Sequence, residues 1–279
     1  MEDVTRIHYD IPASFFPKFL DPYMKYTSGL YRTGEESLEQ ASLNMLDNHI
    51  DFLRPYTCPH ILEIGSGWGA LLKRLIDTKN NFQYLAVNPS PVQNQFVREK
   101  VGLKANILES RFEEATFGAE KFDVIYLIGS FCHLRNQEKQ LEKLSELLAE
   151  DGTVIIEDPF FISEALYQDH AKRKETFFVQ ETVFGYAHIF PFPRFLELVT
   201  TKGLSVRTVL DHSSSYKRTV DEWLRSLGKM DRVEYPLIKQ FCDYLAIGQM
   251  GWHYTIANYL VSLKKKRTQA IRPLSGSQE

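Results

Sequence analysis

The sequence contains few cysteines, and none of them shows the spacing of metal ligands. Three cysteines occur in 279 residues, at Cys58, Cys132 and Cys242, and they lie far apart. An odd, scattered set argues against a disulfide framework, and the lack of a paired Cys or His motif argues against a zinc site. We therefore expect no metal centre, and a reducing cytoplasm is the simplest setting.

The sequence also lacks an excess of charge and a long apolar run. Lys plus Arg number 33 against 36 acidic residues, so the net charge is −3. The chain therefore lacks the excess of basic residues that is typical of nucleic-acid-binding proteins. Residues 1–10 are polar and charged, and no apolar stretch has the length needed to cross a bilayer. The basic run Lys264–Arg267 could contact anionic lipid, but we interpret it as a solvated chain end. Nucleic acid, a transmembrane segment and peripheral lipid contact are therefore not expected.

A glycine-rich stretch stands out against this background. In Ile61–Gly69 a short apolar run ends in glycines at positions 65, 67 and 69, and the amphipathic run Ala70–Ile76 follows. This pattern predicts a strand, a tight turn and a helix. Glycine is needed where the backbone adopts positive φ or lies against a ligand, so the turn predicts a nucleotide-like cofactor. An ordinary strand-to-helix turn is the alternative.

Strand-like and helix-like segments alternate over the first half of the chain. Such alternation predicts an α/β fold with a doubly wound, mostly parallel sheet, whose ligands bind beyond the carboxyl ends of the strands. An amphipathic helix is expected between Glu35 and Pro55, and clear helices at 91–100 and 137–148. The expected strands are 60–64, 83–87, 105–109, 122–128 and 153–157, followed later by 203–210 and 255–263.

Three segments do not fit the alternation. Residues 1–34 combine aromatic side chains with prolines and are expected to form a cover. Residues 158–193 hold nine Phe or Tyr, and residues 212–253 look helical, so we expect two lid insertions over an aromatic pocket. Together, residues 35–267 would form the cofactor-binding domain, and 268–279 a flexible tail.

The second expected strand ends in Asn88, which can hydrogen-bond ribose hydroxyls although it is uncharged. An Asp or Glu at this place would favour a dinucleotide, and its absence weakens that assignment. A nucleoside triphosphate is disfavoured as well, because no Gly-Lys-Ser/Thr follows the glycines.

An ordered set of short motifs carries a family resemblance over about residues 8–263. The set consists of His8-Tyr9-Asp10, Leu20-Asp21-Pro22, Met24, Tyr26-Thr27-Ser28, the loop 65–69, Asn88-Pro89-Ser90-Pro91-Val92-Gln93 and Ile189-Phe190-Pro191. With it the chain resembles the cyclopropane-fatty-acid-synthase-like class of S-adenosyl-L-methionine (SAM)-dependent methyltransferases. The resemblance implies SAM as cofactor and a seven-stranded sheet with an antiparallel last strand.

The resemblance also implies a role for individual residues around SAM. Tyr26 and Thr27 would close over its methionine end, and Gly65 and Gly67 would let the backbone approach it. Asn88 would hold the ribose.

Four further residues complete the implied cofactor site. Gln93 would reach the ribose region, and Phe112 would stack near adenine, where the family usually has Trp. Ile128 and Gly129 would run beside the sulfonium. Gln93 could instead be a surface residue of its helix, and Phe112 a plain core residue.

Departures from the family pattern affect the expected reaction. Cyclopropane synthases of this class bind bicarbonate as general base, and their motif reads approximately Gly-x-Phe-Glu-His. Here Cys132 replaces the Glu, Ser28 stands at a usual Cys, and Glu157-Asp158 stand near the place of a usual His. Because this set is broken, methyl transfer is favoured over cyclopropanation.

The candidates for a base or for substrate orientation are His133, Glu157, Tyr216 and His253. His133 is preferred because it is retained in the motif and titrates near neutrality; a capping or core histidine is the alternative. Glu157 could be a buried partner of Arg194 or a lysine, and Tyr216 could be a packing residue.

The sequence thus predicts a SAM-dependent C- or N-methyltransferase for a small, apolar or aromatic-bearing acceptor. Two alternatives stay open. One is an enzyme that modifies acyl chains, and the other is a SAM-binding protein that has lost methyl transfer or consumes the side chain of SAM itself.

Overall fold

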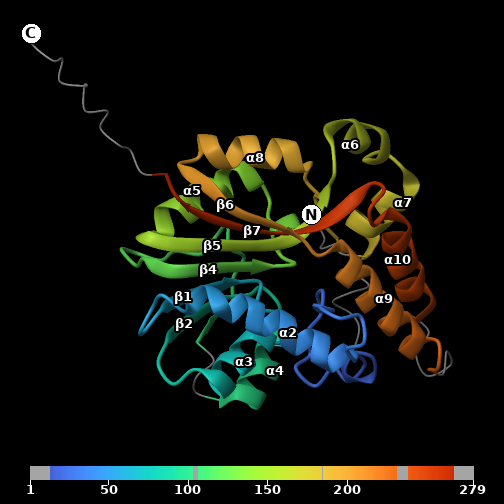
Figure 1. Cartoon of the computed structure of the whole chain (residues 1–279), viewed down its shortest axis with the longest axis horizontal. Helices are drawn as coiled ribbons and strands as arrows, with labels where there is room; N and C mark the ends of the chain where they lie inside the picture. Colours follow the sequence, from blue (N-terminus) through green and yellow to red (C-terminus); the bar gives the residue numbers. More distant parts are fainter. Residues whose placement is uncertain (1–12, 103–105, 184, 231–237, 267–279) are drawn as a thin grey trace, which may run out of the picture.

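The computed structural model describes residues 13–102, 106–183, 185–230 and 238–266, and its centre is a seven-stranded sheet (Figure 1). The strand order is β3-β2-β1-β4-β5-β7-β6. Strands β1 to β5 pair in parallel, whereas β7 runs antiparallel to both β5 and β6. The predicted doubly wound, mostly parallel α/β sheet with an antiparallel last strand is confirmed. The strands are β1 (His60–Ile64), β2 (Gln83–Val87), β3 (Ile107–Leu108), β4 (Phe122–Ile128), β5 (Leu148–Phe161), β6 (Leu204–Asp211) and β7 (Ile256–Lys265).

Helices cover both faces of the sheet, and a further group gathers at one end of it (Figure 1). Helices α5 and α8 lie on one face, and α2, α3 and α4 lie on the other. The α-helices are α2 (Leu38–Ile50), α3 (Ala70–Thr78), α4 (Pro91–Val101), α5 (Gln137–Leu147), α6 (Glu164–His170), α7 (Lys174–Phe177), α8 (Phe192–Thr201), α9 (Ser213–Leu227) and α10 (Ile238–Gly251).

Side-chain alternation along the strands separates two hydrophobic cores. In β1, Leu62 packs in the core that contains α5 and α8, whereas Ile61 packs in the core that contains α2, α3 and α4. Both residues are fully buried. Strand residues that are apolar on both faces are typical of a parallel sheet covered by helices on each side.

Local signals in the sequence determine where several helices begin. Ser37 caps α2 in a capping box with Gln40, and the Ser90 side chain accepts a hydrogen bond from the backbone N–H of Gln93 at the start of α4. Pro91 occupies the first turn of α4, where a missing N–H costs no helical hydrogen bond. These starts place the first residues of both helices at fixed points beside the sheet.

The fifth strand is longer than the sequence predicts. β5 runs over Leu148–Phe161 instead of 153–157, because its carboxyl end pairs with β7 from Val154 to Phe161. The sequence does not predict this extension because it contains Asp158 and Pro159, and charged residues and prolines are both rare inside strands. Consequently the first insertion leaves the sheet after Phe161. At the other edge, β3 is limited to Ile107–Leu108, and Ala105 of the expected strand lies outside the described residues.

A third core joins the N-terminal segment to the second insertion. Phe15 and Phe19 contact Phe241 of α10, and Phe19 also packs against Trp223 of α9. The N-terminal segment therefore packs against helices α9 and α10 of the second insertion. His8, Tyr9 and Asp10 of the sequence motif lie outside the described residues, as do residues 268–279. In the described part of the chain, no helix has the length and apolar character needed to cross a membrane.

Candidate active site

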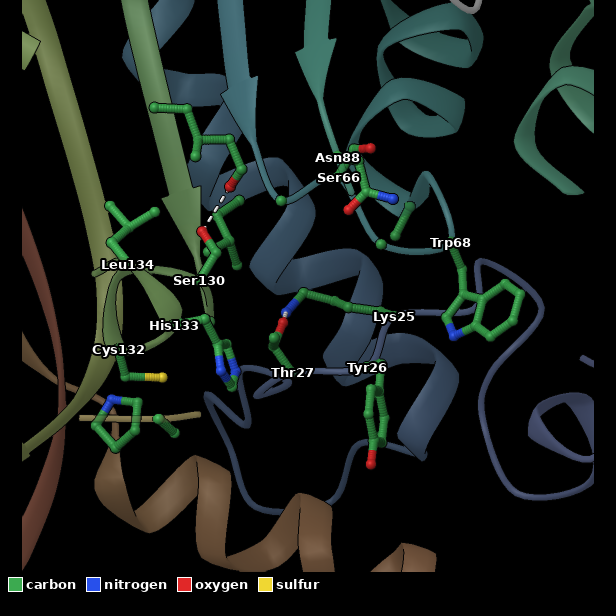
Figure 2. Close-up of a pocket in the computed structure, with 18 of the residues that line it drawn as sticks. Lys25, Tyr26, Thr27, Ser66, Trp68, Asn88, Ser130, Cys132, His133 and Leu134 are labelled. Carbon is green, nitrogen blue, oxygen red and sulfur yellow. Dashed lines mark hydrogen bonds between the residues drawn. The ribbon is translucent and has the colours of Figure 1, made fainter. Parts of the chain in front are cut away.

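A cavity of about 290 Å³ lies beyond the carboxyl ends of β1, β2 and β4 (Figure 2). All the residues that the sequence assigns to the cofactor line it. They are Tyr26, Thr27, Gly65, Gly67, Asn88, Gln93, Phe112, Ile128 and Gly129. The fold therefore brings together segments that lie more than a hundred residues apart in the sequence. Their individual roles toward the cofactor stay predictions.

The glycine-rich loop requires glycine at two positions for different reasons. Gly65 has φ +77°, and a Cβ there would lie 2.6 Å from Cβ of Ser130, so a side chain would clash with the turn after β4. Gly67 has φ +53°, but a Cβ there would meet no described atom within 4 Å. Gly65 thus serves the packing of the loop, whereas the space beside Gly67 is open for a ligand.

Asn88 is held in a network of amides at the end of β2. Its Nδ2 donates to Oδ1 of Asn94 at 2.8 Å and to Oε1 of Gln93 at 3.3 Å. Asn94 in turn donates to Oε2 of Glu109 at 3.0 Å. Because both hydrogens of the Asn88 amide are used within the protein, its Oδ1 is the atom suited to accept a hydrogen bond from a hydroxyl group. A ribose hydroxyl can donate that hydrogen bond, so the arrangement around Asn88 fits a ribose.

Buried polar atoms in the cavity wall provide a second test of whether a polar cofactor fits. The hydroxyl of Ser66 and the indole Nε1 of Trp68 are buried, and neither has a hydrogen-bond partner in the described part of the protein. Buried polar groups normally have a hydrogen-bond partner, so two buried polar atoms without one in a cavity wall suggest that a polar ligand binds there. Together with the open space at Gly67, these groups fit a nucleoside cofactor.

Glu63 belongs to the cavity wall and was not singled out from the sequence. Its side chain is buried, and the Tyr84 hydroxyl donates to its Oε2 at 2.5 Å. Burial raises the pKa of Glu63 to about 7, although the Tyr84 hydrogen bond acts in the opposite direction. The available signal was an acidic residue in the middle of an otherwise apolar strand, immediately before the glycine loop.

Aromatic side chains from the two insertions line the other half of the cavity. The rings of Tyr216 and Trp252 lie 4.8 Å apart between centroids. Tyr186 and Tyr244 add two more rings to the same wall. Burial raises the pKa of Tyr216 well above its ordinary value, so its hydroxyl stays protonated. This half of the cavity is suited to an acceptor with a flat or apolar body.

His133 also lines the cavity, on the short helix Phe131–His133 that follows β4 (Figure 2). Its Nδ1 lies 3.1 Å from the carbonyl oxygen of Tyr186. A carbonyl can only accept, so Nδ1 carries the proton and Nε2 carries the lone pair of the neutral ring. Burial lowers the pKa of His133, while the hydrogen bond to Tyr186 partly opposes this shift. The ring is therefore neutral at pH 7 and can accept a proton at Nε2.

Comparisons with known proteins agree with this geometry. The model of the family described as mycolic acid cyclopropane synthetase matches residues 1–256. The chain belongs to this family. Cyclopropane mycolic acid synthase 1 of Mycobacterium tuberculosis is 25% identical over 235 residues, which cover 80% of this chain and 81% of that protein.

Solved structures share the fold. The cyclopropane synthase MmaA2 from Mycobacterium tuberculosis superposes with a TM-score of 0.84 at 21% identity, covering 95% of this chain and 98% of that one. A coclaurine N-methyltransferase bound to N-methylheliamine and S-adenosylhomocysteine (SAH) gives a TM-score of 0.77 at 21% identity, covering 92% and 80%. As a member of the mycolic acid cyclopropane synthetase family, the chain is an enzyme of the SAM-dependent methyltransferase class, and its cofactor is SAM. The family and cofactor predicted from the sequence are thereby confirmed.

Cys132 stands where the family motif has a Glu, and its surroundings keep the thiol neutral. Burial raises the pKa of Cys132 well above its ordinary value, and the neighbouring Asp158 adds to the shift. Burial also raises the pKa of Asp158 to about 7, although its hydrogen bonds with Cys132 and Phe131 act in the opposite direction. Asp158 lies behind Cys132 and accepts a hydrogen bond from the Phe131 N–H at 2.8 Å. An uncharged thiol thus stands where the resemblance implies a carboxylate.

Two of the predicted catalytic residues are not part of the cavity wall. Glu157 is 2% exposed; its Oε2 lies 2.6 Å from Nε2 of His49, and its Oε1 accepts from Asn258 at 2.9 Å. Arg194, one of the partners considered for a structural Glu157, pairs with Glu164 instead. Glu157 lies outside the cavity wall because side chains alternate between the two faces along β5. Glu157 shares the face of Ile155, which packs toward α2.

His253 is the other candidate that lies outside the cavity wall. It is exposed in the turn after α10, where its Nε2 lies 3.2 Å from the Ser214 hydroxyl. Its neighbour Trp252 reaches the cavity in its place. Of the four candidates, the structure brings His133 and Tyr216 to the cavity.

A substitution at Glu157 distinguishes a structural from a catalytic role. Burial alone would raise the pKa of Glu157, but hydrogen bonds from His212 and His49 outweigh this effect and hold the pKa below its usual range. Glu157→Gln replaces one of the two accepting oxygens with an amide donor, which meets either the donor Asn258 or the Nε2–H of His49. We therefore expect the free energy of unfolding measured in urea to fall by about 1–3 kcal/mol. SAH affinity of the folded protein should stay within about twofold.

Glu164→Gln is the matched control for this test, because Glu164 is a half-exposed carboxylate paired with Arg194. Loss of that surface pair should change stability by less than about 1 kcal/mol. A Glu157→Gln protein that keeps its stability but loses turnover would show that the carboxylate acts in the reaction.

Proposed function

We propose that this enzyme transfers a methyl group from SAM to a nitrogen or carbon atom of a small acceptor with an aromatic or apolar body. The observation that carries the proposal is that His133 lines one cavity together with the glycine-rich loop and the aromatic side chains of Tyr216 and Trp252. When bound, SAM supplies an electrophilic methyl group. The residues of the chain must then orient the acceptor and remove its proton.

The proposed division of work follows the two halves of the cavity. The loop from Gly65 to Gly67 and Asn88 would bind SAM, with Phe112 at its adenine end and Tyr26 and Thr27 at its methionine end. Tyr216 and Trp252 would hold the acceptor ring by stacking and edge contacts.

His133 is the proposed general base. Its Nε2 lone pair would take the proton from the attacking nitrogen or carbon, and an electron pair of the acceptor would form the new bond to the methyl carbon. The electron pair of the broken methyl–sulfur bond would stay on sulfur, which gives SAH. The hydrogen bond from Nδ1 to the Tyr186 carbonyl fixes the ring in the tautomer that this step needs. The fold accommodates amines elsewhere, since the coclaurine N-methyltransferase was solved with N-methylheliamine.

Modification of an acyl chain is the second candidate, and the names of the relatives favour it. Cyclopropane mycolic acid synthase 1 shares four-fifths of its length with this chain. Against it stand Cys132 in place of the motif carboxylate and the aromatic wall of the acceptor half. A long acyl chain is better matched by flexible aliphatic side chains than by the aromatic rings of Tyr186, Tyr216, Tyr244 and Trp252.

An acceptor survey with isotopically labelled SAM tests these alternatives. The purified protein is incubated separately with secondary amines, indoles, carbon acids and vesicles of unsaturated phospholipid. Label recovered in a small acceptor together with SAH supports the proposal. Label recovered in the acyl chains would establish the lipid reaction instead. Release of methylthioadenosine without a methylated product would show that the side chain of SAM is consumed.

A further inference from the structure

Lys25 is a buried lysine in the wall of the cofactor half of the cavity. Its side chain is 3% exposed, and it precedes Tyr26 and Thr27 in the segment that covers the cavity. Figure 2 shows its amine beside the hydroxyl of Thr27. Lysine is almost never fully buried unless its charge is paired, so this position calls for an explanation.

The hydrogen bonds of Lys25 leave its charge uncompensated. Nζ donates to Oγ1 of Thr27 at 2.6 Å and to the carbonyl oxygen of Ser28 at 2.5 Å, and both acceptors are neutral. An ammonium group has three donors, and two are used by these contacts. Within the described residues no carboxylate lies at ion-pair distance from Nζ.

The acidic side chains nearest to Lys25 are already held by other groups. Glu157 is bound by His49 and Asn258, and Glu63 accepts from the Tyr84 hydroxyl. Asp21 accepts from the Ser42 hydroxyl and from the backbone N–H of Tyr23. Burial therefore lowers the pKa of Lys25, and these acids oppose the shift only from a distance.

The chemistry of the cofactor provides an anion of the right kind. Adenine and ribose are uncharged at pH 7, so the α-carboxylate of the methionine moiety is the one negatively charged group of SAM and SAH. A buried ammonium next to a carboxylate gains a charge-assisted hydrogen bond that neither makes with neutral partners. We infer that Lys25 binds the α-carboxylate of the cofactor.

This inference rests on the cofactor placement proposed above, with the ribose at Asn88 and the methionine end at Tyr26 and Thr27. It gives Lys25 a role that the family resemblance did not supply, because Lys25 is not one of the motif residues, which include Met24 and Tyr26 on either side of it. Lys25 would hold the methionine end of the cofactor beneath the N-terminal segment. When the cofactor binds, its carboxylate would also compensate the electrostatic cost of burying the Lys25 ammonium group.

The test compares ligands that differ only at the methionine end, with binding measured by isothermal titration calorimetry. SAH carries the carboxylate, decarboxylated SAH lacks only that group, and methylthioadenosine lacks the whole amino-acid portion. Lys25→Met should weaken SAH binding by about 10- to 100-fold. Affinity for the other two ligands should change by no more than about twofold.

Controls separate this role from a general loss of structure. Lys73→Met removes a lysine that contacts Pro22 and Tyr23 in the same segment but is not part of the cavity wall, so SAH binding should persist. Lys25→Gln offers a second neutral variant with a hydrogen-bonding end, should Lys25→Met fold poorly. Asn88→Leu should weaken SAH and methylthioadenosine together, which tests the cofactor placement on its own.

An equal loss of affinity for SAH and decarboxylated SAH in both Lys25 variants would overturn the inference and leave Lys25 a structural residue. Unchanged SAH affinity would overturn it as well. If Asn88→Leu leaves both ligands unaffected, the placement of the ribose is wrong, and that result is distinguishable from a failure of Lys25.

Discussion

Gly67→Val should abolish measurable binding of SAM and SAH, with a loss of more than about 100-fold. Gly67 has positive φ, and a Cβ there would point into open space beside the cavity instead of into the protein. A valine side chain would occupy the space proposed for the cofactor. Because no described atom lies within 4 Å of the added Cβ, the folded protein has no internal clash to relieve. Calorimetric titration with SAH measures the effect.

The strain of a β-branched residue at positive φ must be separated from the loss of binding space. Gly118 provides the matched control, because it has φ +57° against +53° for Gly67, and a Cβ there also meets nothing within 4 Å. It is exposed and lies outside the cavity wall. Both variants should lose roughly 1–2 kcal/mol of stability from backbone strain, but Gly118→Val should bind SAH normally. Equal loss of binding in the two variants would refute the proposed position of the cofactor.

The part of the fold that could be predicted from sequence is the part dictated by local pattern. Strands β1, β2 and β4 occupy the expected residues, since each is a mostly apolar run that is followed directly by a turn-forming Gly or Asn. Helix α4 begins as expected at Pro91. The extension of β5 through Pro159 could not be predicted, because it depends on pairing with β7 about a hundred residues later.

The same distinction holds for the site. The cofactor residues line the cavity because motifs at the carboxyl ends of parallel strands converge on one edge of a sheet. The partners of Glu157 were beyond sequence reasoning, since His49 lies 108 residues away and meets it only through the packing of α2. Lys25 was missed for a related reason: nothing in a local sequence shows that a lysine will be buried.

His133→Ala should reduce turnover by about 100- to 10,000-fold, the range expected for loss of a general base. SAH affinity should change by no more than about twofold, because His133 is proposed to contact the acceptor and not the cofactor. The comparison is made at saturating SAM with an acceptor identified in the survey, so that the change appears in kcat. His188→Ala is the matched control, since His188 is a histidine of the first insertion that bonds Gln137 and Tyr167 and is not part of the cavity wall.

The pH profile gives this prediction a signature that a packing role would not produce. Neutral imidazole is the active form, and burial lowers the pKa of His133 below its ordinary value of 6.5. Wild-type kcat should therefore be constant around pH 7 and fall only as the pH drops below that lowered pKa, where Nε2 becomes protonated. In His133→Ala this acidic limb should disappear together with most of the rate. A variant that keeps both the full rate and the acidic limb would show that another group removes the proton.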